Sequence, residues 1–524
     1  MAEGKLPSSR VLTVGTLLVA GSNVLSRLLG LARDALLARA GGTSFQTDAY
    51  NIAFLLPDLL NHFLGAGLLS ITLIPLLTPA FKRDDLDGVS RTVSEIFGVV
   101  FGAVTLLALL CFLFAGEIVP HLTEQALPPE TLALTIRYTR ILAFAQIFFV
   151  AGGFLMAVQY GRYRYAIPAL APLVYNASII AGGAVALATG DVACFCWGVL
   201  FGAFAGNFGI QWFGARRAGL RLRPVVDFRS PALRRYLWLT LPFVFGAGAT
   251  FSNELAYRYF GGAGEGNVAG LGFGLRIMMS LVGVFGGAAG VASYPVLARH
   301  CDDGDWEGLA KRVATTLERI FCLLVPATLA IGLLAPEAVS LYLGGGKFGD
   351  ESVRSVVRAL RFYLPVAVPM SATLIVARSF YASKDTWTPS LLTLGAFLAT
   401  LPFYALFGEE LGDVRVPVLS FATALLQISL LGIFWARRHP SREHLRPIFA
   451  LLKMALPMAL LAWGASRGLE LWNRPENGLL FFLELALLGC GLYLLSLLLL
   501  WPLRIPGFQE WTAALKRKAL RRRC

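Results

Sequence analysis

Charged residues are scarce in this sequence of 524 residues: Asp, Glu, Lys and Arg together make up 15% of it, whereas hydrophobic residues make up 56%. Soluble domains carry about 25% charged residues. Apolar stretches of roughly 20 residues, each long enough to cross a hydrocarbon layer ~30 Å thick, recur from one end of the chain to the other. This composition excludes a large water-soluble domain and predicts an all-α polytopic membrane protein.

Cysteine is also sparse and has no regular spacing. The seven cysteines are scattered, and the closely spaced pair Cys194 and Cys196 lacks the spacing of a metal site. Neither a disulfide framework nor a zinc site is therefore predicted. The acidic run "HCDDGDWEG" (300–308) offers metal-binding side chains in principle, but a solvated helix N-terminus explains it as well. We expect no cofactor and no metal.

Positive charge is abundant, with a formal net charge of +14, but it is confined to alternate loops. Arginines crowd 216–235 and 437–446, and Lys and Arg crowd the C-terminal tail, whereas the loops after 119 and 408 are acidic. This is the distribution that the positive-inside rule requires of a multi-pass protein. It predicts that both termini are cytoplasmic, and it argues against nucleic acid as a partner.

The apolar stretches predict fourteen transmembrane helices. Their expected ranges are 11–40, 46–81, 89–119, 130–160, 164–188, 192–215, 232–261, 267–299, 308–335, 351–383, 387–408, 414–436, 446–466 and 478–503.

Glycine and proline landmarks repeat along the chain. Pro75 follows Gly41 at the same interval at which Pro295 follows Gly261. The segments "YGRYRYAIPAL" and "YASKDTWTPSL" also correspond, and in each a tyrosine precedes a proline by the same distance along the chain. Because these matches share an offset of about 220 residues, they indicate a duplicated unit of six helices. The alternative is that glycine and proline are simply frequent in membrane helices.

Six spans per unit give both copies the same orientation, which is typical of transporters that rock two lobes about a central cavity. We therefore expect an N-terminal lobe at 1–225 (helices 1–6) and a C-terminal lobe at 226–440 (helices 7–12). Residues 441–524 hold two further helices, 13 and 14, and a basic cytoplasmic tail.

Several charges lie inside predicted spans, where each costs about 2.5–3.5 kcal/mol on insertion scales. At 100° per residue, Arg27 and Asp34 fall within about 60° of one another on the first helix, and Arg33 is about 120° from Arg27. Such side chains usually face a bundle interior or a watery cavity. Because guanidinium groups bind phosphate bidentately, a row of arginines along a central path suits an anionic substrate.

The other candidate residues lie on helices 2, 7 and 8. Asp48 opens helix 2, where Asp58, Asn61 and His62 follow at i, i+3 and i+4 on one face; Glu254 and Arg258 form an i, i+4 pair on helix 7; Arg276 stands alone in helix 8. We expect Arg27, Arg33, Arg276, Arg258, Asn61 and His62 to bind substrate, and Asp34, Asp48 and Glu254 to form gating ion pairs. The alternative is structural pairing or snorkelling, which we favour for Arg39, Arg137, Arg140 and Arg378.

Four segments taken in order carry a resemblance to a known family. They are "SRLLGLARDALLARAGGTSFQTDAYNIAFLLPDLL", "YGRYRYAIPALAPLVYNASII", "LGFGLRIMMSLVGVFGGAAGVASYPVL" and "ARSFYASKDTWTP". Together they resemble the MurJ (MviN) family of bacterial lipid II flippases, a branch of the multidrug and oligosaccharidyl-lipid exporters. The resemblance implies two six-helix lobes around a cationic cavity that opens alternately to each side, and a groove from helices 13 and 14 for a polyprenyl tail.

The resemblance also implies roles for individual residues. The family's essential arginines fall on Arg27, Arg33 and Arg276, and its aspartates fall on Asp34 and Asp48. Helix 2 and helix 8 depart from the family pattern. Asn61 and His62 replace two arginines, Ala66 replaces a glutamate and Leu275 replaces an aspartate, and Lys347 stands where an arginine after helix 9 is usual.

The sequence therefore predicts a flippase that moves undecaprenyl-pyrophosphate-linked peptidoglycan precursor across the bacterial inner membrane for cell-wall synthesis. It is not expected to be an enzyme; the membrane potential or an ion gradient would drive it. Three alternatives stay open: transport of another lipid-linked glycan (an O-antigen or exopolysaccharide unit) or of an amphipathic drug, an integral-membrane transferase, and a scaffold that transports nothing.

Overall fold

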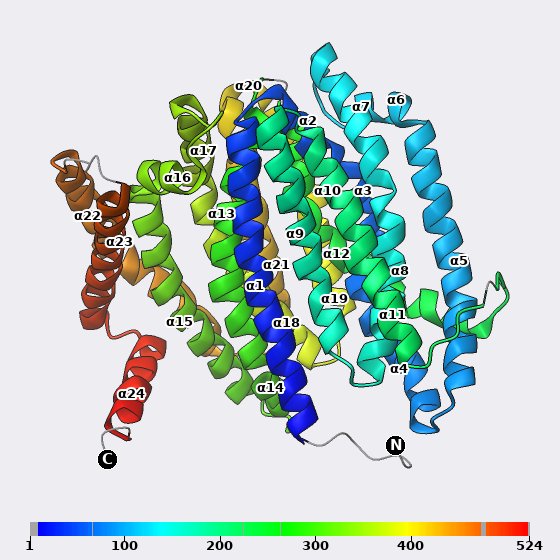
Figure 1. The fold of residues 1–524 in the computed structure, drawn as a ribbon. Helices are drawn as coiled ribbons and strands as arrows, with labels where there is room; N and C mark the ends of the chain where they lie inside the picture. The colour runs from blue at the N-terminus through cyan, green and yellow to red at the C-terminus, as the bar shows by residue number, and fades with distance from the viewer. Residues whose placement is uncertain (1–8, 65, 224, 263, 473–477, 522–524) are drawn as a thin grey trace. The chain divides into compact units, whose positions relative to one another are not determined.

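The computed structural model describes residues 9–64, 66–223, 225–262, 264–472 and 478–521. Throughout these residues the chain is helical, with no β-strand and one isolated bridge between Gly345 and Phe348 (Figure 1). The mainly apolar composition thus produces the all-α fold that the sequence predicts.

The described residues of the first half form twelve α-helices, one 3-10 helix of three residues and one π-helix of seven residues. They are α1 (Ser9–Gly41), α2 (Phe45–Ala53), α3 (Leu55–Leu64), α4 (Ala66–Lys82), α5 (Leu86–Leu113), α6 (Ala115–Ile118), η1 (Val119–His121), α7 (Pro129–Ala143), α8 (Ala145–Gly161), α9 (Ala166–Thr189), α10 (Ala193–Gly202), η2 (Ala203–Gly209), α11 (Ile210–Arg217) and α12 (Pro231–Phe260).

The second half continues in the same way. Its elements are α13 (Asn267–Leu281), η3 (Val282–Gly287), α14 (Ala288–Asp302), α15 (Trp306–Leu333), α16 (Ala335–Leu343), α17 (Asp350–Tyr363), η4 (Leu364–Val366), α18 (Ala367–Ala382), α19 (Trp387–Leu406), α20 (Gly408–Leu411), η5 (Gly412–Val414), α21 (Arg415–Arg438), η6 (Arg442–Leu445), α22 (Arg446–Glu470), α23 (Gly478–Leu500), η7 (Trp501–Leu503) and α24 (Pro506–Arg521).

Twelve helical segments of the described chain are long and apolar enough to cross a membrane, and each overlaps one of the predicted spans. The two remaining predicted spans correspond to α12, a single helix of 30 residues, and to the consecutive helices α2, α3 and α4. The protein is therefore a multi-pass membrane protein, as the sequence predicts.

The backbone supports the internal duplication independently of the glycines and prolines. Residues in the left-handed conformation, which end a helix or link it to the next, recur in pairs at the spacing of the sequence repeat. These pairs are Gly42 and Gly262, Asp84 and Gly304, Tyr163 and Lys384, and Gly190 and Gly412. Asp84, Tyr163 and Lys384 are not glycines, so a glycine count alone misses half of this pattern.

The cap of α5 is repeated as well. Asp85 Oδ1 accepts a hydrogen bond from the Gly88 amide at 2.7 Å, and Asp305 Oδ1 accepts one from the Gly308 amide at 2.8 Å at the start of α15. Such caps satisfy amides that the first turn of a helix leaves free. Turns and caps thus follow the same order in both copies of a six-helix repeat.

The offset between equivalent residues of the two copies changes by one position within one helix. A π-helical segment accounts for this change. The helix beginning at Ala193 corresponds to the one beginning at Arg415, but the interval between their last residues, Arg217 and Arg438, is shorter by a single position. Between these ends, η2 is π-helical. Because a π-turn holds one more residue than an α-turn, it absorbs the extra residue and restores the register.

By packing, the chain divides into two compact units. Unit 1 comprises Met1–Ala269 and Leu343–Ser352, and unit 2 comprises Gly270–Tyr342 and Val353–Cys524. In unit 1, α1 lies along α9 (Figure 1), and a core that includes Val93, Phe154 and Tyr236 lies among α4, α5, α8 and the start of α12. In unit 2, α15 packs on α18, α22, α23 and α24. The lobe boundaries at 225 and 440 were predicted from the sequence repeat, whereas the two units are defined by packing. Those lobe boundaries therefore stay a prediction.

A buried carboxylate joins three helices of unit 2. The Glu318 side chain on α15 is 1% exposed, and its two oxygens accept hydrogen bonds from Arg446 Nε at 3.0 Å and Nη2 at 2.9 Å. Glu318 Oε2 also accepts from the Gly507 amide at 2.7 Å, which attaches the start of α24. An ionised group without partners here would be strongly unfavourable.

Replacing Arg446 by alanine is expected to lower the free energy of unfolding by about 3 kcal/mol or more, because Glu318 would stay buried without its cation. The measurement is thermal unfolding of the full chain in detergent. Arg467→Ala is the matched control, since the Arg467–Glu470 pair is 68% and 66% exposed and such pairs contribute about 1 kcal/mol at most. Equal losses in the two variants would contradict the assignment.

Candidate functional site

The predicted polar stripe of α1 carries charges in two different environments. Arg27 is exposed, whereas Arg33 is half-buried and Asp34 is buried. Arg33 donates to Asp34 Oδ1 from Nε at 3.1 Å and from Nη2 at 3.0 Å. The expected partnership of Asp34 with an arginine is thus present, between neighbouring residues of the same helix.

The face of α1 that carries Arg33 is held against α9 by polar contacts. Asn176 Nδ2 donates to Ser26 Oγ at 3.0 Å, and Ser22 Oγ donates to the Ala169 carbonyl. A second charged cluster of unit 1 lies on α3 and α12.

That cluster is centred on Arg258, near the end of α12. Its side chain is only 6% exposed, and it donates to Asp58 Oδ2 at 2.8 Å and to Glu254 Oε2 at 2.9 Å. Its Nε donates to the Tyr257 hydroxyl at 3.0 Å. All three nitrogens of the guanidinium are thus engaged by protein groups.

The Glu254–Arg258 pair expected from the i, i+4 spacing is present, but Asp58 is a third member whose role the sequence did not reveal. Asp58 and Arg258 are 200 residues apart, and no local pattern links them. With two carboxylates and one guanidinium, the cluster carries a formal charge of −1. An anionic substrate would therefore have to displace a carboxylate before it could bind Arg258 in this conformation.

Asp48 has partners different from those expected. It is 5% exposed, and instead of an arginine its carboxylate accepts from the Gly266 amide at 2.6 Å (Oδ2) and the Ala269 amide at 2.7 Å (Oδ1). These amides belong to the start of α13, where free N–H groups and the helix dipole attract negative charge. Asp48 thus acts as a helix cap supplied by another segment.

Gly266 makes this close approach possible. Its φ of +79° is a left-handed conformation, and a Cβ there would lie 2.5 Å from the Thr43 carbonyl oxygen. A side chain at this position would therefore push α13 away from Asp48.

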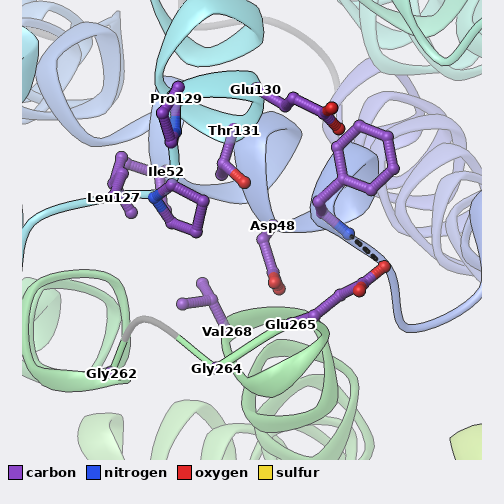
Figure 2. A pocket seen from close by; sticks show the side chains of 12 residues that line it. Asp48, Ile52, Leu127, Pro129, Glu130, Thr131, Gly262, Gly264, Glu265 and Val268 are labelled. Carbon is purple, nitrogen blue, oxygen red and sulfur yellow. Dashed lines mark hydrogen bonds between the residues drawn. The ribbon is translucent and has the colours of Figure 1, made fainter.

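A pocket of about 390 Å³ adjoins this contact in unit 1. Figure 2 shows Asp48 between Ile52 and Val268, with Glu130 and Glu265 at its margin. Glu265 accepts a long hydrogen bond of 3.5 Å from the Phe45 amide. The lining is thus acidic and apolar, unlike the cationic site that an anionic headgroup requires.

The link between α1 and α2 also holds residues 343–352. The Lys347 amide donates to the Arg39 carbonyl at 2.9 Å, and Arg39 Nε donates to the Gly344 carbonyl at 3.1 Å. Thr43 Oγ1 donates to Ser352 Oγ at 2.8 Å. Arg39 is therefore a structural residue, as favoured from the sequence, and the backbone of Lys347 has a structural role too.

The remaining candidates are placed as follows. Arg276 lies in α13 within unit 2, half-buried, with its guanidinium carbon 5.6 Å from the centre of the Phe273 ring. Asn61 and His62 lie in α3, and their side chains are outside the described part of the structure.

The acidic run at 300–308 covers the end of α14, the turn that follows and the start of α15. Asp305 caps this helix and also pairs with His300 Nδ1 at 2.9 Å. The Gly308 amide and His300 hold the pKa of Asp305 below its usual value. Over the described residues, no group of three or more His, Cys, Asp or Glu side chains is placed to hold a metal.

Asp48→Ala is expected to speed hydrogen exchange at the Gly266 and Ala269 amides about tenfold, because losing a helix cap costs about 1–2 kcal/mol. Asp48→Asn keeps one accepting oxygen and should change less. The measurement is amide exchange by mass spectrometry on peptides covering 264–270. Asp85→Ala, which removes the cap of α5, serves as the control and should leave these peptides unchanged; unaltered exchange in Asp48→Ala would contradict the assignment.

Comparisons with known proteins agree on one family. The model of the family described as "Lipid II flippase MurJ" matches residues 37–484. A probable lipid II flippase MurJ of Rhizobium meliloti is 30% identical over 436 residues, covering 79% of each chain. The lipid II flippase MurJ of Burkholderia cenocepacia is 28% identical over 468 residues, covering 86% of this chain and 89% of its own.

Solved structures show the same fold. A lipid II flippase MurJ in an inward closed conformation superposes with a TM-score of 0.74 at 19% identity, covering 92% of this chain and 98% of its own. An inward-facing multidrug resistance MATE family transporter of the MOP superfamily gives 0.63 at 17% identity, covering 79% and 94%. From the family match and the similarity to the Rhizobium protein, the chain belongs to the lipid II flippase MurJ family.

Proposed function

We propose that this protein flips lipid II, the undecaprenyl-pyrophosphate-linked peptidoglycan precursor, from the cytoplasmic to the periplasmic leaflet. The observation that carries the proposal is the family match over 37–484, joined to the arginines on α1. A flippase moves its lipid without changing it chemically, so no catalytic group is required.

Arg27, Arg33 and Arg276 hold the pyrophosphate. A polar headgroup cannot cross hydrocarbon unaided, and guanidinium groups supply charge-assisted hydrogen bonds in place of water. Arg27 is exposed and available for this, and the Arg33–Asp34 contact is one that a phosphate can compete for. Asn61 and His62 contribute hydrogen bonds to the same headgroup.

The carboxylates favour the conformation without substrate. Asp34 neutralises Arg33, Glu254 neutralises Arg258, and Asp48 holds the first turn of α13. When the substrate binds Arg33, or displaces Glu254 from Arg258, the pair is broken and the equilibrium between conformations shifts, since a ligand favours the state that it binds more tightly.

Alternating access of two lobes, 1–225 and 226–440, carries the headgroup across, and the helices within 441–524 guide the polyprenyl tail. A membrane potential acts on a moving charge with about 2.3 kcal/mol per 100 mV, so the potential or an ion gradient is sufficient to reset the carrier. No cofactor takes part. The protein resides in the bacterial inner membrane with both termini in the cytoplasm.

The test is complementation in cells depleted of their own flippase. Lipid II reaching the outer leaflet becomes sensitive to a membrane-impermeant reagent that cleaves it. Wild-type protein should restore this sensitivity, and Arg27→Ala, Arg33→Ala or Arg276→Ala should each lower it about tenfold or more, because a hydrogen bond to a charged group contributes about 1.5–3 kcal/mol.

Arg91→Ala is the matched control, since the Arg91 side chain on α5 is 83% exposed and lies outside the proposed path. Expression in the membrane should be equal for all variants. Failure of the wild type to restore sensitivity, or Arg276→Ala behaving like Arg91→Ala, would refute the proposal.

A second candidate is transport of another polyprenyl-pyrophosphate-linked glycan, such as an O-antigen or exopolysaccharide unit. The departures from the family pattern at Asn61, His62 and Leu275 favour it, because they remove charges that the family normally has. Restoration of surface polysaccharide without restoration of outer-leaflet lipid II would select this candidate.

A further inference from the structure

A second pocket in unit 1, of about 560 Å³, lies at the ends of three apolar helices. Its walls come from the first turns of α1 and α9, the last turn of α11 and the link between α8 and α9. The apolar part includes Val14, Leu18, Ala166 and Ile167. Val14 and Leu18 are about half exposed, at 48% and 45%.

Two arginines that line the pocket have no counter-ion among the described residues. Arg164 and Arg217 both line it and are exposed, and neither has an ion pair among the described residues. Arg164 Nη1 donates to the Arg217 carbonyl at 2.5 Å, and Arg217 stacks on Phe213 with 4.1 Å from its guanidinium carbon to the ring centre. These contacts hold both guanidinium groups in place but neutralise neither.

The internal duplication provides an equivalent place in the second copy with which this pocket can be compared. At the spacing that pairs Tyr163 with Lys384, Arg164 and Arg217 correspond to Asp385 and Arg438, which form an ion pair of 2.5 Å. The carboxylate of Asp385 carries a lowered pKa, against the effect of burial, because Thr388 and Arg438 donate to it. At these two positions the second copy therefore carries a neutral ion pair.

The second copy is also filled. Gln159 and Gly214 correspond to Phe380 and Trp435, whose rings pack edge to face with their centres 4.9 Å apart. The correspondence is supported by contact, since a Cβ on Gly214 would lie 2.2 Å from Gln159 Oε1. Where the second copy has two aromatic rings, the first has an amide and a glycine.

The first copy thus differs from the second in charge and in volume at the same place. Arg164 lies where the second copy has an aspartate, which leaves two cations, and smaller side chains lie where the second copy has aromatic rings. Gln159 is fully buried and lines the pocket, and its Oε1 has no hydrogen-bond partner within the described residues. Two cations that no carboxylate of the described residues neutralises, beside an apolar pocket, are features of a binding site for an anionic ligand. A purely structural contact does not require them.

We propose that this pocket binds a phospholipid through its anionic phosphate. The phosphate lies between Arg164 and Arg217, and an acyl chain lies along Val14, Leu18 and Ala166. The site lies at span ends, where a lipid headgroup is found, and each arginine near a membrane surface contributes about 1 kcal/mol toward anionic lipid.

The experiment uses the full chain in phosphatidylcholine vesicles that contain a minor fraction of a photoactivatable phosphatidylglycerol bearing a diazirine on its acyl chain. Cross-links are mapped by mass spectrometry. They are expected within 14–18 and 166–167, and about 30-fold weaker binding is expected in Arg164→Gln/Arg217→Gln. A phosphatidylcholine probe with the same diazirine should label these residues much less.

Two further variants keep the result interpretable. Arg216→Gln/Arg221→Gln removes the same charge from exposed arginines that do not line the pocket, and should leave the labelling unchanged. Ala166→Trp fills the pocket with both guanidinium groups intact, and should abolish it.

Equal labelling by the two probes, equal loss in both double variants, or full labelling of Ala166→Trp would each overturn the proposal. So would soluble glycerol 3-phosphate displacing the probe as effectively as phosphatidylglycerol does, because the occupant would then be a free phosphate and not a lipid. None of these outcomes depends on whether lipid II is the transported substrate.

Discussion

A charge inside an apolar helix bundle needs a partner within the protein, and this requirement determines much of the structure. Arg258 is bound by Asp58 and Glu254, and Glu318 by Arg446 and a backbone amide. Because an uncompensated charge at such a site costs several kcal/mol, each pair dictates which helices must lie together. Arg27 differs from these buried residues because its side chain is exposed on a span. A guanidinium in that position is stable where water or an anion reaches it.

The duplication provides the frame in which these charges have diverged. Turns of left-handed conformation and aspartate caps recur at a nearly constant offset, so the backbone path has been kept while the side chains have changed. After α8 the first copy has two arginines that pair with no carboxylate of the described residues, whereas the equivalent place after α18 has an acid–base pair. Two equivalent places that share a backbone path but differ in charge bind different ligands, although they belong to one fold.

Hydropathy and loop charge were sufficient to predict the spans, since each span depends on local composition. The repeat was visible because glycines at helix ends and prolines within helices recur at a common offset. The pair of Glu254 and Arg258 was predictable for the same local reason. The contacts of Asp58 with Arg258 and of Asp48 with α13 were not, because they join segments far apart in the sequence. Asp48 was expected to meet an arginine, and only the fold reveals that a helix terminus supplies its positive charge.

The position of the segment 343–352 in the sequence has a consequence for the order in which the protein folds. This segment belongs to unit 1, although Gly270–Tyr342 of unit 2 precedes it in the chain. A nascent chain leaves the ribosome from its N-terminus onward, and domains generally fold in that order. Here the amino-terminal unit cannot acquire its final contacts at Arg39 and Thr43 until Ser352 has been synthesised, so it is completed only after Gly270–Tyr342 of unit 2 has been synthesised as well.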